Sequence, residues 1–337
     1  MARPKVYVTR ILPSEKAMNM LREYCDVDLN EKPEPPSREE LIEHVKGKDG
    51  LLCLLTDKID KEVMDVAPNL KVISTYSVGF DHIDIEEATK RGIYVTHTPG
   101  VLTEAVADLT WGLILAVARR VVESDKLIRQ GSWKGAWSPT FMLGREVYGK
   151  TLGIIGMGRI GTAVARRAKG FNMRIIYFDK ARRENVEKEL GAEYKPMEEV
   201  LKEADIISLH VPLTKETHHL IGERELKMMK KTAILINTAR GAVVDTDALV
   251  RALKEGWIAG AGLDVFEQEP LPEGHPLTKL DNVVLTPHIG SAAVETRARM
   301  AEMAVENLIA VLKGEEPKAL ANPDVKNVRP LSEVKMI

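Results

Sequence analysis

The chain has 337 residues, enough for two domains of ordinary size, each with its own hydrophobic core. Hydrophobic residues make up 44% of it and charged residues 29%, and its net charge of -2 offers no basic surface for nucleic acid. It has two cysteines, Cys25 and Cys53, and no apolar run near the roughly 20 residues that span a membrane. We therefore predict a cytoplasmic globular protein without a disulfide framework, a membrane span or a nucleic-acid partner.

The first hundred residues alternate short apolar strands with helical stretches. Ser37 and Glu40 form a capping-box pattern ahead of one helix, and Asp60 can cap the next. Strands that alternate with helices predict a doubly wound parallel sheet, which here ends near Pro99. The strands are predicted at residues 6–8, 27–29, 50–55, 72–75 and 94–96.

Residues 102–129 are rich in Ala, Leu and Val and predict one long helix that is apolar around much of its girth. The following segment, residues 131–150, holds Trp133, Trp137 and Phe141 with four glycines and is too irregular for a helix. An aromatic arm of this kind buries against another surface, and a partner subunit is the candidate. We therefore predict a homodimer.

Residues 151–161 contain a buried-strand pattern followed by a Gly-x-Gly-x-x-Gly turn and a helix start. In such a turn Gly156 permits the tight bend, and Gly158 lets backbone N–H groups approach a pyrophosphate. Gly161 lets the helix pack closely on the strand. The positive end of that helix, near Arg159, then faces the phosphates.

A second apolar strand, residues 174–179, ends in an acid 18 residues after the last glycine of the turn. A dinucleotide-binding fold places there the carboxylate that holds the adenosine ribose, and Asp179 is the candidate. Strand, glycine turn, helix, strand and acid together predict a Rossmann unit.

Buried-strand patterns continue after this unit, at residues 205–209, 233–237, 258–264 and 282–285. An amphipathic helix then covers residues 292–313 and is stopped by Gly314. This helix has no sheet of its own left to cover, so we expect it to return to the N-terminal domain. The chain beyond Val328 is expected to be loose.

The predicted fold class is α/β, with two doubly wound parallel-sheet, Rossmann-like domains. One domain is predicted to comprise residues 1–99 plus 290–330, and the family resemblance given below implies that it is the substrate domain and that the active site lies in the cleft between the domains. The NAD(P)-binding Rossmann domain, residues 100–289, is inserted into the substrate domain, and residues 331–337 form a tail.

Three segments at strand ends contain polar residues that a simple hydrophobic core would exclude. They are residues 237–241, 264–270 and 286–291. In open α/β sheets, ligands bind beyond the carboxyl ends of the strands, so these segments are the candidates for the chemistry of the site.

The chain resembles the D-2-hydroxyacid dehydrogenases over nearly its whole length. Within that family it is most similar to the glyoxylate and hydroxypyruvate reductases, through residues 50–57 and 71–79. The resemblance implies hydride transfer from a nicotinamide to the carbonyl carbon of a small 2-oxo acid, with glyoxylate and hydroxypyruvate as the expected substrates. The family landmarks are residues 76–81, 153–161, 209–214, 237–241, 264–270 and 287–290.

Three residues are predicted to be catalytic. A 2-oxo acid offers a carboxylate, which a planar guanidinium binds in a bidentate manner, and Arg240 is placed to do this. Reduction leaves negative charge on the ketone oxygen, so a proton donor that titrates near neutral pH is needed, and His288 fits. Glu269 matches the acid of the family, and a carboxylate on the second imidazole nitrogen favours the charged ring.

The resemblance also implies further contacts to the ligands. Leu54, Val78 and Gly79 are expected to bind substrate, and the N–H groups of Val78 and Gly79 would donate to its carboxylate. Asp264 would hold the nicotinamide carboxamide. The expected cofactor contacts are Thr103, Gly156, Gly158, Arg159, Ile160, Gly161, Asp179, Lys180, His210, Pro212, Thr217, Thr238, Ala239, Arg240, Asp264, His288 and Gly290.

The sequence carries opposing signals for the choice of cofactor. Asp179 can accept bonds from both ribose hydroxyls of NAD and would repel the 2′-phosphate of NADP. Lys180, Arg182 and Arg183 follow it and could reach that phosphate. Because ordering long cations on a loop loses side-chain entropy, we predict that NADH is preferred and that NADPH activity is measurable.

Plainer interpretations stay open beside these. Arg240 could form a structural salt bridge, His288 could be a core histidine, and Asp264 could cap a strand end. Glu267 is interpreted as a solvated loop acid. His218 and His219 are adjacent and cannot point the same way on regular structure, and we predict no metal site.

Alternative functions are a D-3-phosphoglycerate dehydrogenase or another D-2-hydroxyacid dehydrogenase, and, from a different class, an NAD-sensing corepressor. Formate dehydrogenases resemble the family but carry a glutamine in place of Glu269, which argues against that chemistry.

Overall fold

The computed structural model describes residues 3–337, which form two compact units. Unit 1 contains the chain up to Leu102 together with Ser291–Ile337, and unit 2 is Thr103–Gly290. Each unit is built around one parallel sheet with helices on both faces, so the predicted α/β class with two doubly wound sheets is confirmed. None of the described helices is both long and apolar enough to cross a bilayer.

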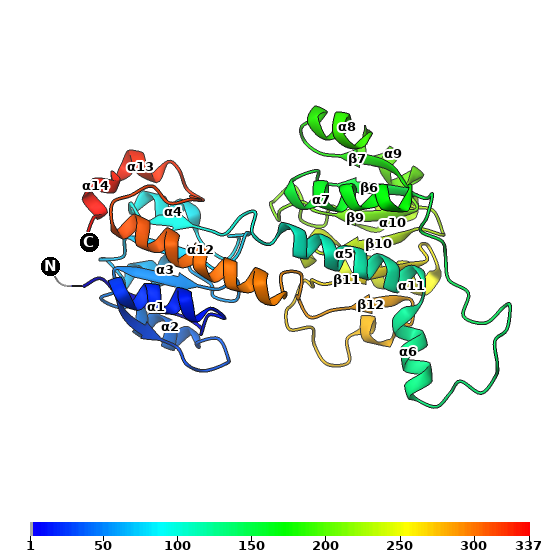
Figure 1. The fold of residues 1–337 in the computed structure, drawn as a ribbon, viewed down its shortest axis with the longest axis horizontal. Helices are drawn as coiled ribbons and strands as arrows, with labels where there is room; N and C mark the ends of the chain where they lie inside the picture. Colours follow the sequence, from blue (N-terminus) through cyan, green and yellow to red (C-terminus); the bar gives the residue numbers. More distant parts are fainter. Residues whose placement is uncertain (1–2) are drawn as a thin grey trace. The chain divides into compact units, whose positions relative to one another are not determined.

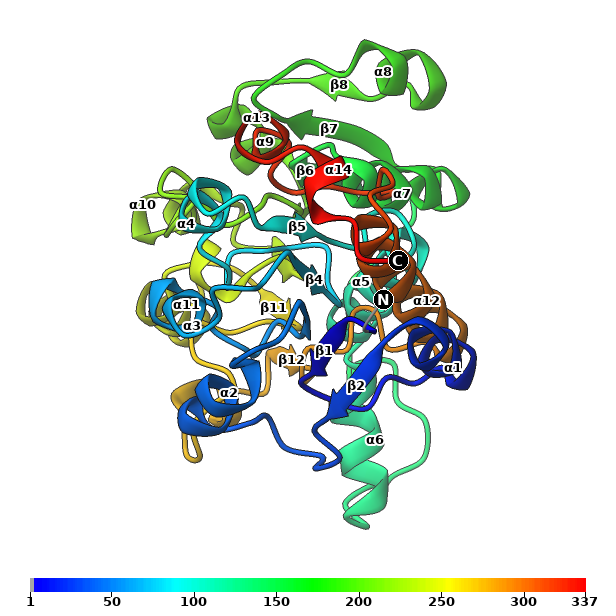
Figure 2. The ribbon, with the colours of Figure 1, turned by 90° about the vertical axis from the view of Figure 1, so that its left-hand side faces the viewer.

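Unit 1 holds a five-stranded sheet in the order β2-β1-β3-β4-β5, and every pair of strands is parallel. Helices α1 and α12 lie on one side of this sheet, and α2, α3 and α4 lie on the other (Figure 2). The elements of unit 1 are β1 Lys5–Val8, α1 Glu15–Tyr24, β2 Asp26–Leu29, α2 Arg38–Val45, β3 Gly50–Cys53, α3 Lys61–Asp65, β4 Val72–Thr75, α4 Ile85–Lys90, β5 Tyr94–Thr96, α12 Val294–Leu312, α13 Val325–Val328 and α14 Leu331–Val334.

Local signals in the sequence explain where several of these helices begin. Ser37 accepts a hydrogen bond from the N–H of Glu40, whose carboxylate bonds back to the Ser37 N–H, so the predicted capping box is present. Asp60 accepts from the N–H of Val63 at the start of α3, as predicted. These caps satisfy backbone donors that the first helical turn leaves without partners.

The end of the chain differs from the expectation that it is loose. Val334 in α14 is fully buried, and the N–H of Met336 donates to the carbonyl of Leu312, 2.7 Å away, at the end of α12. Gly314, at φ +72°, turns the chain after α12. The tail is therefore packed because it covers and satisfies the end of that helix.

Unit 2 holds a seven-stranded parallel sheet in the order β12-β11-β10-β9-β6-β7-β8. Helices α5 and α7 cover one face, and α9, α10 and α11 cover the other (Figure 1). Its elements are α5 Thr103–Ala118, α6 Val121–Arg129, β6 Thr151–Ile155, α7 Arg159–Ala168, β7 Arg174–Phe178, α8 Glu184–Leu190, β8 Glu193–Tyr194, α9 Met197–Glu203, β9 Ile206–Leu209, α10 Glu223–Met228, β10 Ile234–Asn237, α11 Thr246–Glu255, β11 Gly260–Leu263 and β12 Val283–Leu285, with short 3-10 turns at Lys169–Phe171, Gly241–Val243 and Pro276–Lys279.

The strand order of unit 2 reverses at β6, which explains where a ligand can bind. The chain proceeds from β6 to β7 and β8 on one side, then returns to β9, on the other side of β6. The carboxyl ends of β6 and β9 thus flank the point where the strand order reverses, which is the usual ligand position in doubly wound sheets.

The single long helix predicted over residues 102–129 is wrong. Two helices, α5 and α6, replace it. The break lies at Arg120, whose backbone adopts the left-handed conformation at φ 54°. The carbonyl of Ala118 accepts a bond from the N–H of Arg145, 2.7 Å away, and Gly144 packs on the same carbonyl. The break is therefore fixed by a distant segment of the chain.

Candidate active site

The glycine turn after β6 has the geometry of a phosphate cradle. Gly156 is at φ +98°, and a Cβ there would lie 2.6 Å from the carbonyl oxygen of His210, so neither its conformation nor its surroundings admit a side chain. A Cβ at Gly161 would lie 2.1 Å from the Gly156 oxygen. Gly158, the N-cap of α7, faces open space instead. The turn thus offers room at the positive end of a helix, where Arg159 and Ile160 begin the first turn.

Asp179 lies beside this turn and is tied to it. Its Oδ2 accepts a bond from the Met157 N–H at 2.9 Å, while its Oδ1 has only a long contact of 3.4 Å with the Ala181 N–H. Its side chain is 13% exposed. Lys180, the next residue, is exposed.

The arginines that follow Asp179 are engaged by acids. Arg182 forms a bidentate pair with Glu187, with bonds of 2.8 and 2.7 Å. The Tyr177 hydroxyl also donates to Glu187, at 2.8 Å. Arg183 lies 3.5 Å from Asp179. Two of the three cations at this loop are therefore held by carboxylates.

The loop after β9 carries His210, Pro212 and Thr217, and β9 lies on the other side of β6 from β7. His210 Nε2 bonds to the Ser208 hydroxyl at 2.8 Å, and burial lowers the pKa of His210 to about 3, so its ring is neutral near pH 7. The Thr217 hydroxyl donates to the Pro212 carbonyl at 2.6 Å and accepts from the Thr214 N–H. This hydroxyl shapes its own loop, and its contact with the cofactor stays a prediction.

Arg240 stands on a loop that Asn237 shapes at the end of β10. Asn237 donates from Nδ2 to the Arg240 carbonyl at 2.9 Å and accepts from the Ala239 N–H at 3.1 Å. The Arg240 guanidinium donates to the Ala239 carbonyl at 2.9 Å. Thr238 bonds through its hydroxyl to Thr110 of α5 at 3.0 Å. The predicted residues of this loop are thus fixed in place by bonds within unit 2.

Glu269 and His288 lie 19 residues apart in the sequence and are hydrogen-bonded to each other in the structure. Glu269 Oε2 lies 2.7 Å from His288 Nδ1, and Glu269 Oε1 accepts from the Phe266 N–H at 3.0 Å. Burial raises the pKa of Glu269, but the bonds from His288 and Phe266 and the charge of Arg240 lower it more, so the net pKa lies below the usual value. Because Nδ1 is engaged, Nε2 is the ring nitrogen left to meet a substrate.

Asp264 fixes the loop that carries His288. Its carboxylate accepts from the Thr286 hydroxyl at 2.6 Å and from the N–H groups of Ile289 and Gly290, each at 2.8 Å. Its carbonyl accepts from the His288 N–H at 2.9 Å. Burial raises the pKa of Asp264 above its usual value despite these bonds. The strand-end interpretation of Asp264 therefore has direct structural support, and its contact with the nicotinamide stays a prediction.

The expected substrate residues of unit 1 lie on two loops at the carboxyl ends of its strands. Leu54 directly follows β3, beside the reversal of strand order between β1 and β3, and its N–H donates to Asp57 at 2.7 Å. The carbonyls of Val78 and Gly79 accept bonds from His97 Nδ1 at 2.8 Å and from Ser77 Oγ at 2.7 Å. Both peptide groups are therefore fixed, and their contact with substrate stays a prediction.

The sequence of unit 2 identifies the family. Residues 111–290 match the model of the NAD binding domain of D-isomer specific 2-hydroxyacid dehydrogenases, which is more than half of the chain. The chain belongs to this family. The resemblance inferred from the motifs is thus confirmed, and the chain is a member of a family of nicotinamide-dependent oxidoreductases.

Relatives and solved structures resemble the chain over most or all of its length. A glyoxylate reductase of Thermofilum pendens is 66% identical over 100% of both chains. Among solved structures, an NADPH-dependent glyoxylate/hydroxypyruvate reductase of Sinorhizobium meliloti, in complex with NADP and malonate, is 34% identical with a TM-score of 0.84, over 96% of this chain and 98% of that one. A D-lactate dehydrogenase of Aquifex aeolicus, complexed with NAD and lactic acid, is 35% identical with a TM-score of 0.81, over 92% and 96%.

The structure also gives roles to residues that the sequence analysis passed over. Asn237 shapes the Arg240 loop, a role that its position two residues before Ala239 could have suggested, because Asx side chains bond to N–H groups two residues on. Glu267 is not simply solvated, since it bonds to His219 and Thr246.

The rings of His218 and His219 stack with centroids 4.1 Å apart, and the backbone of His219 is in the left-handed region, at φ 51°. Among the described residues, no group of three or more His, Cys, Asp or Glu is placed to hold a metal ion.

Proposed function

We propose that this dehydrogenase reduces glyoxylate, and also hydroxypyruvate, to the corresponding 2-hydroxy acid. The observation that carries the proposal is the bond between His288 and Glu269, within reach of the Arg240 charge, at the carboxyl ends of β10 to β12. The Arg240 guanidinium can bind a carboxylate, and the His288 imidazole, bonded to Glu269, can donate a proton to a carbonyl oxygen. Together they suit a substrate with a carboxylate next to a carbonyl. The 66% identity to a glyoxylate reductase supports glyoxylate as the substrate among the 2-oxo acids.

The residues present fit a nicotinamide dinucleotide. The open space at Gly158 and the start of α7 suit its pyrophosphate, and Asp179 Oδ1 suits a ribose hydroxyl. When bound, the cofactor supplies the hydride that reduces the carbonyl carbon.

The protein supplies the proton and the orientation. Glu269 holds His288 through Nδ1 and favours the charged ring, so His288 Nε2 donates the proton that the carbonyl oxygen takes up. Arg240 orients the substrate carboxylate through N–H groups in a planar fork. Proton and hydride together convert the carbonyl to an alcohol.

We further propose that NADH is the preferred cofactor. Asp179 is held at the strand end by the Met157 N–H, so its charge would face a 2′-phosphate at short range. Glu187 holds Arg182, and Arg183 lies beside Asp179, so both arginines would have to give up a carboxylate to reach that phosphate. Lys180 could still contact the 2′-phosphate of NADPH, so we expect a lower but measurable activity with NADPH.

Steady-state rates decide the substrate and the cofactor together. The substrates are glyoxylate, hydroxypyruvate, pyruvate and phosphohydroxypyruvate, each with NADH and NADPH. We expect the highest kcat/KM with glyoxylate or hydroxypyruvate and NADH, and a loss of kcat of roughly 10²-fold or more in His288→Ala. The highest kcat/KM with phosphohydroxypyruvate would favour a D-3-phosphoglycerate dehydrogenase, and full turnover in His288→Ala would reject the proton donor.

We also propose a homodimer in the cytoplasm. Apolar side chains are exposed on the arm after α6, including Trp133 at 54%, Trp137 at 85% and Leu143 at 65%. The arm runs out as a long loop from the body of unit 2 (Figure 1). Exposed aromatic side chains close together in the sequence of one loop support a subunit interface there.

A further inference from the structure

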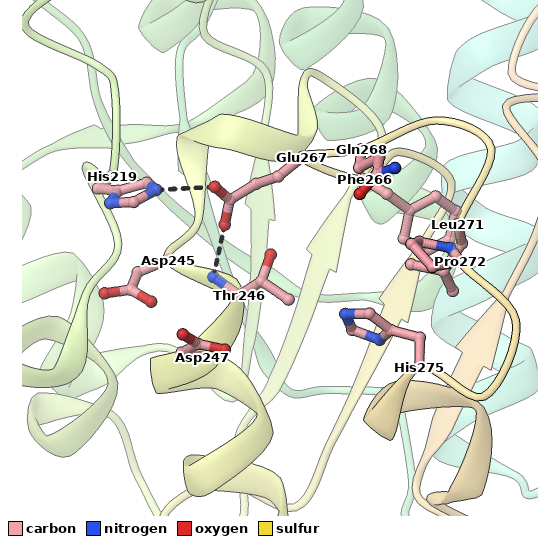
Figure 3. Close-up of a pocket in the computed structure, with 10 residues that line it drawn as sticks. All are labelled: His219, Asp245, Thr246, Asp247, Phe266, Glu267, Gln268, Leu271, Pro272 and His275. Carbon is pink, nitrogen blue, oxygen red and sulfur yellow. Dashed lines mark hydrogen bonds and ion pairs between the residues drawn. The ribbon is translucent and has the colours of Figure 1, made fainter.

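Behind the loop that carries Glu269, unit 2 has a hollow of about 270 Å³ whose lining includes His219, Thr246, Glu267 and His275 (Figure 3). Glu267 extends from the loop to two other segments. Its Oε2 lies 3.0 Å from His219 Nε2, and its Oε1 accepts from the Thr246 N–H at 2.8 Å. Both carboxylate oxygens of Glu267 thus bond to protein groups, although its side chain is 34% exposed.

Both partners of Glu267 are themselves fixed. Thr246 is the first residue of α11, directly after its N-cap Asp245, which accepts from the Ala248 N–H at 3.0 Å. His219 is held by a bond of 2.7 Å from its N–H to the Ala242 carbonyl. Because α11 packs into the core of unit 2, the two bonds tie the loop to a rigid part of the fold.

The same loop is clamped from a second direction. A Cβ on Gly241 would lie 1.8 Å from the carbonyl carbon of Phe266 and 2.4 Å from the Glu267 nitrogen, so this glycine touches the loop backbone directly. Gly241 follows Arg240 in the chain, and Phe266 donates its N–H to Glu269. The peptide group between Phe266 and Glu267 is therefore in contact with the Arg240 loop on one side and bonded to Glu269 on the other.

We propose that Glu267, with His219, is a positioning residue for the reduction, which fixes the loop so that Glu269 reaches His288. Glu267 acts through Glu269 and has no contact with the reacting groups. Displacements of about 1 Å in such a support cost up to roughly 10²-fold in rate, because the catalytic bond loses its alignment. The proposal rests on the proposed function, since the reduction of glyoxylate is its main assay.

The test compares Glu267→Ala, Glu267→Gln, Glu269→Gln and the double variant E267A/E269Q, with Glu273→Ala as the control from the same loop. The kcat and KM for glyoxylate are measured over pH 5 to 9 with NADH. We expect E267A to lower kcat by roughly 10-fold and to move the alkaline limit of reduction to lower pH, as E269Q does. E267Q keeps an acceptor for Thr246 and a donor for His219, so it should recover most of the loss.

The double variant separates positioning from plain destabilisation. If Glu267 acts through Glu269, E267A should cost less than about 2-fold more in the E269Q background. Independent, multiplicative losses, or a lower Tm with an unmoved pH limit, would overturn the proposal. Glu273→Ala should match the wild type.

A readout without turnover distinguishes this proposal from the function itself. The NMR signal of the Nδ1 proton of His288, identified by its change of chemical shift in E269Q, reports the bond to Glu269 directly. We expect this signal to be weakened in E267A and kept in E267Q, and an unchanged signal in E267A would overturn the proposal. If the wild type reduces no 2-oxo acid, the proposed function fails, and the NMR comparison still decides the role of Glu267.

Discussion

Glu269→Gln tests the site most sharply, because it removes one charge and keeps a side chain of the same shape. In the wild type Glu269 Oε2 lies 2.7 Å from His288 Nδ1. By reciprocity, a charged imidazole that lowers the pKa of Glu269 is itself favoured by the carboxylate. Glu269→Gln removes the attraction between this carboxylate and the charged ring, so the alkaline limit of reduction should move down.

The size of this shift follows from the geometry. Charges about 4 Å apart attract by about 1 kcal/mol in water and about 4 kcal/mol at an effective dielectric constant near 20. The side chains of His288 and Glu269 are 27% and 31% exposed, so solvent screens the pair and an intermediate value of about 2 kcal/mol applies. Glu269→Gln removes this attraction, which sets how far the alkaline limit falls.

The assay is the pH profile of kcat/KM for glyoxylate reduction, with the reverse oxidation of the hydroxy acid as a second reading. Oxidation needs the neutral ring, so its acid limit should move to lower pH by the same amount. Glu273→Gln removes a charge from the same loop and should leave both profiles in place. Profiles of Glu269→Gln that coincide with the wild type would refute the electrostatic role and leave Glu269 a structural part of the loop.

Other predictions concern the ligands and the arm. Arg240→Lys keeps the charge but loses the planar fork, so the KM for glyoxylate should rise by roughly 10-fold or more, and an unchanged KM would place the carboxylate elsewhere. Asp179→Ser should shift the ratio of kcat/KM toward NADPH by about tenfold, which corresponds to about 1.4 kcal/mol of lost repulsion. A wild type that already prefers NADPH would contradict the role of Asp179. Light scattering should give twice the chain mass at micromolar concentration and the monomer mass for Trp137→Glu, whereas a monomeric wild type would rule out the dimer.

Sequence patterns predicted those parts of the fold that local chemistry determines. The glycine turn is an example, because a side chain at Gly156 or Gly161 would clash with backbone, while Gly158 leaves open space at the start of α7. The pairing of Glu269 with His288 came from the family motifs, and the structure adds the bond that joins them. The caps at Ser37 and Asp60 depend on neighbours three residues away and were equally visible.

The errors concern features that distant segments impose. Nothing in the sequence near Arg120 breaks a helix, and the break depends on bonds to residues about 25 positions later. Glu267 looked like a loop acid because its partner His219 lies 48 residues earlier. Val334 looked like part of a loose tail, yet its burial depends on the end of α12. Local pattern carries no information about such contacts.

Unit 1 is made of two separate segments of the chain, so its sheet is synthesised long before the helix that covers it. All five strands of its sheet precede residue 97, but α12, which covers β3, β4 and β5, begins at Val294. Unit 2 is continuous and is synthesised entirely in between. At about 5 to 20 residues per second, the apolar face that waits for α12 stays uncovered on the ribosome for on the order of 10 to 40 s. Unit 2 is therefore complete in the nascent chain while the first strands of unit 1 still lack their cover, and synthesis of Ser291–Ile337 completes the fold.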